Sequence, residues 1–177
     1  MIIRKAHPED AAGIVRVHIA AWQTTYHGIV PADYLEMLPM QAEERQERWE
    51  RTLRDKAIFN FVAEDEEHGK IAGFINGGPR MHDDPAYPGE LYSVYILAEY
   101  QKLGLGKQLV QTLAGAMYKA GYSSLWLWAL DENINAISFY KKLGARKYKS
   151  NIFELHGAKI PESALVWDDI SVLIGEV

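Results

Sequence analysis

The stretch ELYSVYILAEYQKLGLGKQ, residues 90–108, joins three local patterns in the order strand, glycine turn and helix. Residues 90–97 are rich in β-branched and aromatic side chains, which favour an extended strand. Over residues 104–120, apolar side chains recur at helical spacing and predict one buried face: Leu105, Leu109, Leu113 and Met117. The glycine turn therefore lies where a helix begins directly after a strand.

This glycine turn has two interpretations. Gly104 and Gly106 lack the Cβ atoms that would hold a large anion away from the backbone. The first amides of a helix have no internal partners and carry partial positive charge, to which Lys102 and Lys107 add at the rim. A pyrophosphate could bind there, and we then expect Gly106 to adopt a positive φ. The same spacing also suits an ordinary connection between a strand and a helix.

Two known glycine motifs do not match this turn. The Walker A motif requires Ser or Thr after its Gly-Lys pair and a glycine five positions earlier, but Gln108 and Gln101 occupy those positions. The dinucleotide fingerprint requires a third glycine where this chain has Leu109. A phosphate-binding role therefore depends on the context of strand and helix.

The rest of the chain alternates between strand and helix patterns. Residues 58–62 and 71–75 form a predicted hairpin, so the middle of the sheet is expected to be antiparallel. The order β-α-α-α-β-β-β-α-β-α-β-β predicts a mixed α/β fold whose later strands are linked by helices. Other strands are predicted at residues 2–6, 123–130, 148–156 and 164–168, other helices at 7–22, 34–38, 41–55 and 133–143, and a loop at 77–89.

Composition excludes several classes of function. A chain of 177 residues suits one domain over residues 1–177, and its net charge of −5 argues against a nucleic acid partner. There are no cysteines, which excludes disulfides, Cys-based zinc sites and a Cys nucleophile. The chain has neither a signal-peptide pattern nor 18 consecutive uncharged apolar residues. We therefore expect a cytoplasmic protein with no membrane partner.

Two motifs together resemble those of the GCN5-related N-acetyltransferase (GNAT) superfamily. The first is residues 90–106, a strand followed by Gln-x-x-Gly-x-Gly and a helix. The second follows at the expected separation and reads Asn133-x-x-Ala136-x-x-Phe139-Tyr140-x-Lys142-Leu143-Gly144. The chain departs from the family pattern by placing Ala145, not an aromatic residue, after that glycine. The resemblance covers almost the whole chain and implies a mostly antiparallel mixed sheet, helices on both faces and two splayed parallel central strands.

The resemblance also implies a cosubstrate, acetyl-coenzyme A, lying between strands 90–97 and 123–130. Asn133 would contact the far end of the pantetheine, although it also suits a plain helix cap. The remaining implied contacts are main-chain groups of Val94, Tyr95 and Ile96 with the pantetheine, and Gln101, Lys102, Leu103, Gly104, Leu105, Gly106 and Lys107 with the pyrophosphate.

The chemistry of acetyl transfer requires a proton acceptor and a proton donor. By the resemblance, Tyr140 lies near the coenzyme sulfur and protonates the departing thiolate; otherwise it is an aromatic core residue beside Phe139. Glu90 begins the central strand, where its carboxylate is either the base, directly or through water, or a solvated charge. A main-chain amide of the same strand would stabilise the oxyanion.

The acceptor side is less clearly marked in the sequence. Trp22, Tyr26 and His27 lie near the first two predicted helices, which wall the acceptor site in this family, although Trp22 also suits helix packing. Trp126 and Trp128 share one face of their strand and are expected in the core. Residues 82–84 (HDD) have no second ligand group at a defined spacing, so no metal is expected.

The sequence therefore predicts an enzyme that moves the acetyl group of acetyl-CoA directly onto a primary amine of a small molecule. Two alternatives remain open: a protein or peptide acceptor, and an acyl-CoA-binding sensor without turnover. The last two strands also offer a sheet edge that could pair in a homodimer.

Overall fold

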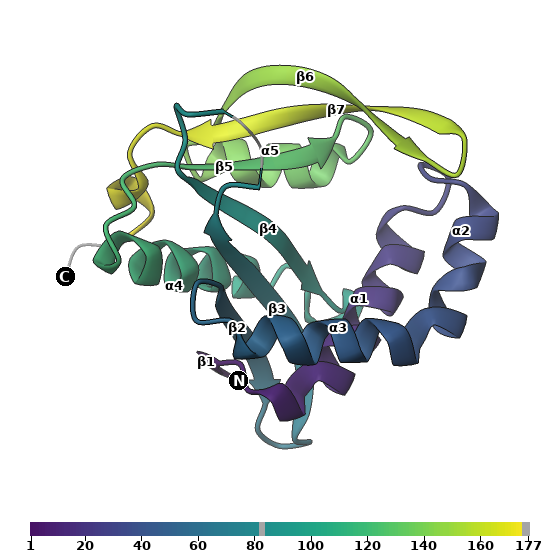
Figure 1. Cartoon of the computed structure of the whole chain (residues 1–177). Helices are drawn as coiled ribbons and strands as arrows, with labels where there is room; N and C mark the ends of the chain where they lie inside the picture. The colour runs from purple at the N-terminus through teal and green to yellow at the C-terminus, as the bar shows by residue number, and fades with distance from the viewer. Residues whose placement is uncertain (82–83, 175–177) are drawn as a thin grey trace.

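The computed structural model describes residues 1–81 and 84–174, and its described strands form one seven-stranded sheet in the order β1-β2-β3-β4-β5-β7-β6 (Figure 1). The strands are β1 (Ile2–Lys5), β2 (Phe59–Asp65), β3 (Lys70–Pro79), β4 (Gly89–Ile96), β5 (Leu125–Leu130), β6 (Arg146–Leu155) and β7 (Ala158–Trp167). The α-helices are α1 (Ala11–Thr25), α2 (Ala32–Met37), α3 (Ala42–Arg54), α4 (Leu105–Lys119) and α5 (Ile134–Lys142).

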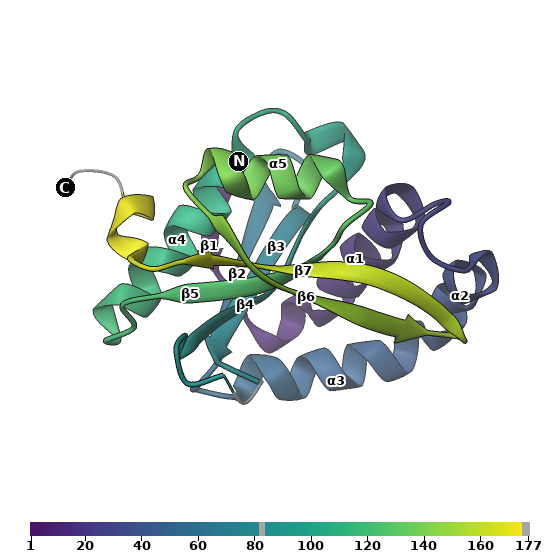
Figure 2. The same ribbon diagram turned by 90° about the horizontal axis from the view of Figure 1, so that it is seen from above.

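Helices cover both faces of this sheet, and Figure 2 shows α5 and α3 on opposite sides of the strands. On one face, the apolar side of α4 packs with Leu125 and Leu127 of β5 and with Tyr140 of α5. On the other face, α1 and α3 pack over β2 and β3 around Phe74. Both faces of the sheet carry apolar side chains that must be buried, so helices pack on both of them, as the sequence pattern predicts.

The central strands β4 and β5 are parallel but barely paired. Their ladder contains two residue pairs, Gly89 with Leu125 and Glu90 with Trp126. Beyond these pairs the strands diverge, as Figure 1 shows, while β4 stays paired to β3 as far as Ile96. The predicted mixed sheet with two splayed central strands is thereby confirmed. Beyond Glu90, the edge of β4 that faces β5 therefore has no neighbouring strand among the described residues.

The hairpin of β6 and β7 reaches across the molecule to α2. His156 and Gly157 connect the strands with φ values of 48° and 78°, the backbone of a two-residue turn that favours glycine at its second position. Near its tip, the hairpin contributes Ile160 to an apolar cluster with Val30 and Leu35. Contact with α2 therefore closes one end of the space beside β5.

Two predicted boundaries are wrong. The predicted loop at 77–89 begins later, because β3 continues to Pro79 and pairs Gly77 with Leu91. A Cβ atom on Gly77 would lie 2.6 Å from the carbonyl oxygen of Glu90, so this glycine permits close strand packing and does not make a turn. The last strand begins at Ala158, directly after the two-residue turn, and not at residue 164.

Candidate active site

A cleft of about 1080 Å³ lies where β4 and β5 diverge. Its walls come from the end of α1, the open edge of β4, the start of α4, β5 and the first turns of α5. Eleven of the predicted site residues line it: Tyr26, Val94, Tyr95, Ile96, Gln101, Lys102, Gly104, Gly106, Lys107, Asn133 and Tyr140. The fold thus brings most of the predicted coenzyme contacts to one cavity.

The glycine turn at the mouth of the cleft presents unpaired amides. Gly104 is the N-cap of α4 with φ of 83°, and Lys102 also has a positive φ, of 62°. The first amide to donate into the helix is that of Gln108, which bonds to the carbonyl of Gly104 at 3.2 Å. Among the described residues, amides 103–107 donate to no main-chain carbonyl. They are therefore available for an anion at the positive end of α4.

The expectation of a positive φ at Gly106 is wrong, since that conformation belongs to Gly104. A Cβ atom at position 106 would lie 3.3 Å from the ring of Phe139 and 3.5 Å from Ile96. Glycine at this position therefore permits close packing of α4 against α5 and β4. A Cβ atom on Gly104 would lie 3.9 Å from the side chain of Gln108, an ordinary contact, so there the backbone conformation is what favours glycine.

Asn133 has both features that the sequence suggested for it. Its side-chain oxygen accepts a hydrogen bond from the amide of Ala136 at 3.2 Å, which makes it the N-cap of α5. It also lines the cleft beside Ile134. Its contact with a pantetheine stays a prediction.

Tyr140 is 7% exposed and lines the cleft from α5. Its ring packs against Phe139 at 5.2 Å and Trp167 at 6.0 Å between centroids. Burial raises the pKa of the Tyr140 hydroxyl, and the neighbouring Tyr26 raises it further. The phenol is therefore neutral at physiological pH and can act as a donor.

Glu90 lies at the start of β4 and is 3% exposed, so it is not a solvated charge. Its carboxylate accepts a hydrogen bond from the amide of Met81 at 2.7 Å. Glu90 is not among the residues that line the cleft, and neither are Leu103 and Leu105. The role of Glu90 as the base stays a prediction.

The three predicted acceptor residues have different surroundings. Tyr26 caps the end of α1 and lines the cleft. Trp22 packs edge-on against Tyr26 at 4.7 Å and lies 5.5 Å from Tyr34, in an aromatic cluster between α1 and α2. His27 is exposed in the turn after α1 and is not among the cleft residues. Of the three, Tyr26 has the position that a ligand contact needs.

Sequence reasoning missed Trp128 as a cleft residue. Trp126 is fully buried, as predicted, but Trp128 is partly exposed and lines the cleft. The expected splay of the strands could have indicated this, because residue 128 lies beyond the two pairs that join β4 to β5 and so faces the gap between them.

On β6, Lys149 lies 4.7 Å from the centre of the Trp126 ring and forms an ion pair with Asp84 at 2.9 Å.

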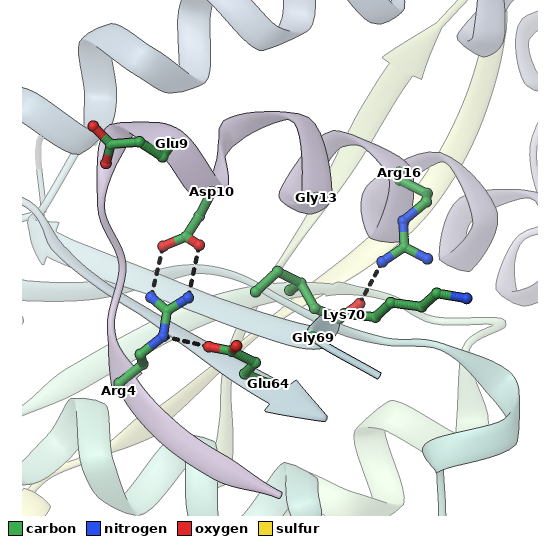
Figure 3. A pocket seen from close by; sticks show the side chains of 9 residues that line it. Arg4, Glu9, Asp10, Gly13, Arg16, Glu64, Gly69 and Lys70 are labelled. Carbon is green, nitrogen blue, oxygen red and sulfur yellow. Dashed lines mark hydrogen bonds and ion pairs between the residues drawn. The ribbon is translucent and has the colours of Figure 1, made fainter. Parts of the chain in front are cut away.

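A second hollow, of about 490 Å³, lies between the start of α1 and strands β1, β2 and β3 (Figure 3). Arg4 donates to both oxygens of Asp10, at 2.7 and 2.8 Å, and to Glu64 at 2.6 Å. Arg16 donates to the carbonyl of Ile71 at 2.9 Å. These charges bind one another and fasten β1 to β2, so we assign the hollow a structural role.

Metal binding finds no support in the described ranges, where no three His, Asp or Glu side chains are grouped to hold an ion. Of the sequence candidate at 82–84, residues 82 and 83 lie outside the described residues. Within residues 1–81 and 84–174, none of the helices is long and apolar enough to cross a bilayer.

Comparisons with known proteins agree with this geometry. Residues 19–145 match the acetyltransferase (GNAT) family. The chain is 37% identical over 172 residues to an uncharacterised N-acetyltransferase, YuaI, of Bacillus subtilis, covering 97% of this chain and 95% of that protein. It is 32% identical over 139 residues to a mycothiol acetyltransferase of Thermobifida fusca, covering 74% of this chain and 41% of the relative.

The fold resembles that of a PaiA N-acetyltransferase from Thermoplasma acidophilum, solved in complex with coenzyme A. The TM-score is 0.71 at 23% identity, over 92% of this chain and 96% of that one. The splayed strands and the amide-rich turn agree with the matched sequence pattern. The chain therefore belongs to the acetyltransferase (GNAT) family, as an acetyl-CoA-dependent N-acetyltransferase.

Proposed function

We propose that this enzyme transfers the acetyl group of acetyl-CoA directly to a primary amine of a small molecule. The observation that carries the proposal is the open edge of β4, which leads from the glycine turn into the cleft. A pantetheine arm can pair with the free main-chain groups of Val94 to Ile96 as an added strand does. Its pyrophosphate then reaches the amides of residues 103–107.

The chemical step follows from this placement. A neutral amine attacks the thioester carbonyl, and an amide of β4 stabilises the oxyanion that forms. Tyr140 then donates toward the departing sulfur, while Glu90, directly or through water, accepts a proton from the amine. Because the chain has no cysteine, the acetyl group cannot pass through a Cys-acyl intermediate.

The shape of the acceptor side supports a small acceptor. The β6–β7 hairpin packs its apolar residues against α2, and His156 lies 3.6 Å from Asp33. This contact narrows the approach for a folded protein substrate. Aromatic side chains, among them Trp128 and Tyr26, line the remaining opening.

The test is release of free thiol from acetyl-CoA in the presence of a panel of small primary amines. We expect release that depends strictly on the amine and saturates with one class of acceptor. A parallel panel of peptides with free N-termini tests the alternative acceptor. Saturable binding of acetyl-CoA with no release across both panels would contradict the proposal and support a sensor.

A further inference from the structure

Four tyrosines line the same cleft, and one of them, Tyr92 of β4, donates its hydroxyl to the carbonyl of Pro79. Tyr26 comes from the end of α1, Tyr95 from β4 and Tyr140 from α5. The proposed function, on which this inference rests, gives a role to the Tyr140 hydroxyl alone. The hydroxyls of Tyr26 and Tyr95 therefore remain to be explained.

Tyr26 is held firmly at the end of its helix. Its amide bonds to the carbonyl of Trp22 at 3.0 Å, and its own carbonyl accepts from Ile29 and Val30 at 2.9 and 3.1 Å. Its ring packs edge-on against Trp22, with centroids 4.7 Å apart. The direction in which its hydroxyl points is therefore set by packing outside the cleft.

The Tyr26 side chain lines the cleft between the splayed strands from the end of α1. Its neighbours there are Tyr95 on β4 and Asn133 at the start of α5, both of which lower the pKa of the Tyr26 hydroxyl. It also lies close enough to Tyr140 to raise the pKa of that phenol. Two phenols from opposite walls thus converge on one part of the cleft.

The hydroxyls of Tyr26 and Tyr95 are protonated at physiological pH and can donate hydrogen bonds. Burial raises the pKa of Tyr26, an effect that its contacts with Tyr95 and Asn133 partly offset. Burial also raises the pKa of Tyr95, behind which the His18 ring stacks at 5.0 Å. The other titratable side chains that line the cleft are Tyr92 on β4, Lys102 and Lys107 at the turn, and Glu132 after β5.

The pKa of the Tyr140 hydroxyl is poorly matched to that of the thiol whose thiolate it protonates. A thiol of this kind has a pKa of about 8.5, and an ordinary phenol about 10. Since burial raises the pKa of Tyr140 further, transfer of its proton to the thiolate is uphill by more than about tenfold. Because this proton transfer is unfavourable, the sulfur carries negative charge as it departs, and a second hydrogen bond would stabilise that charge.

We propose that Tyr26 is a second phenolic donor to the departing coenzyme A thiolate, placed across the cleft from Tyr140. The amine nitrogen bonds to the acetyl carbon, the carbon–sulfur bond breaks, and its electron pair goes to sulfur. Tyr140 gives its proton to that sulfur, Glu90 takes one from the nitrogen, directly or through water, as the amide forms, and solvent returns that proton to Tyr140. Tyr26 donates a hydrogen bond to the sulfur and keeps its proton.

The first test measures the thiol of bound coenzyme A. Its pKa is read from the ultraviolet absorbance of the thiolate, or from its alkylation rate, across a range of pH. We expect Tyr26→Phe to raise this pKa by about one, because a hydrogen bond to a charged group commonly contributes about tenfold or more. The matched control is Tyr34→Phe, which removes a phenol from the same aromatic cluster but outside the cleft lining.

The second test is a double-mutant cycle on kcat. We expect Tyr26→Phe alone to lower kcat about tenfold, and to lower it more in a Tyr140→Phe background, where Tyr26 is the remaining donor of the pair. The ring and its packing on Trp22 are kept, and an unchanged melting temperature verifies that the variant folds.

The outcomes separate this inference from the proposed function. A bound thiol with the same pKa in the parent, Tyr26→Phe and Tyr34→Phe chains overturns the role of Tyr26 and leaves acetyl transfer intact. A parent chain that does not bind coenzyme A overturns both. A raised thiol pKa confined to Tyr26→Phe supports the second donor.

Discussion

At the scale of single residues, Tyr140 has the clearest chemical consequence. Removing its hydroxyl by Tyr140→Phe keeps the ring that packs against Phe139 and Trp167. We expect kcat to fall about 100-fold, within the range typical of general acid help, while coenzyme affinity and melting temperature stay near those of the parent.

Steady-state kinetics and thermal unfolding of the same preparations check this expectation. Tyr118→Phe is the control, since it removes a phenol from the exposed face of α4. If kcat changes less than about threefold with the fold intact, Tyr140 is a core aromatic and not the acid.

His18 gives a prediction about stability and pH. Burial, and then the positive charges of Arg45 and Arg48, lower the pKa of its imidazole to about 4, whereas an unfolded His titrates near 6.5. The unfolded chain therefore binds more protons between these values, and stability falls as the pH drops from about 6.5 to about 4. The difference corresponds to about 3 kcal/mol of unfolding free energy at most.

Urea unfolding at pH 7 and pH 5 measures this effect. In His18→Phe, whose ring can still stack on Tyr95, we expect the loss on the acidic side to shrink. The exposed His27 offers the control variant His27→Phe, which should keep the parent's pH dependence. Equal pH dependence in all three chains would show that His18 does not titrate as described.

Residue chemistry was only partly readable from the sequence. Tyr140 and Asn133 both line the cleft, as expected, because their motif spacing places them on one short helix and its N-cap. The surroundings of Glu90 were not readable, because its burial depends on the loop before β4, which donates the amide of Met81. Long-range contacts of this kind leave no periodic signal in the chain.

At the scale of elements, the start of α4 depends on one backbone conformation. Gly104 has φ of 83°, which costs an ordinary L-residue roughly 1–2 kcal/mol. We expect Gly104→Val to lower both stability and acetyl-CoA affinity, because a β-branched residue at positive φ distorts the amide-rich turn.

The matched variant is Gly104→Asn, since Asn tolerates the left-handed region far better than Val. Urea unfolding and calorimetric titration with acetyl-CoA measure the two quantities. Similar losses in both variants would mean that the side chain, and not the backbone conformation, disturbs the turn.

Element types followed the sequence closely, whereas the boundaries of β3 and β7 did not. Helices α4 and α5 were predicted almost to the residue, since periodicity and capping both mark them. The end of β3 was missed because Gly77 suggested a turn, although the tight approach to Glu90 was its actual cause. A glycine chosen for close packing looks the same in sequence as one chosen for a turn.

At the scale of the whole molecule, the cleft lies between two halves of the sheet whose strand ladder contains only two residue pairs, Gly89 with Leu125 and Glu90 with Trp126. Acetyl-CoA should therefore stabilise the folded chain. At about 100 times the dissociation constant, binding contributes roughly 2.7 kcal/mol, or on the order of 5–10 °C in melting temperature. Thermal unfolding with and without the ligand measures it, and no shift at millimolar ligand would contradict the site.

The order of strands was beyond the sequence. β7 lies between β5 and β6, so the last strand of the chain pairs with β5 and the preceding one forms the edge. Patterns of alternation define a strand and its faces, but pairing is decided by which apolar faces meet. The resemblance supplied the splay of the central strands, which local patterns do not encode.

The open edge of β4 also has a fixed length, which bears on the choice of acyl donor. Residues 91–96 extend about 20 Å at the usual rise of a strand, and the turn proposed to receive the diphosphate begins just beyond them. The distance between the diphosphate and the thioester of an acyl donor would therefore have to match this fixed length of backbone. A short thioester without the nucleotide portion has no diphosphate to bind at the turn, so we expect this enzyme to select its donor by length as well as by charge.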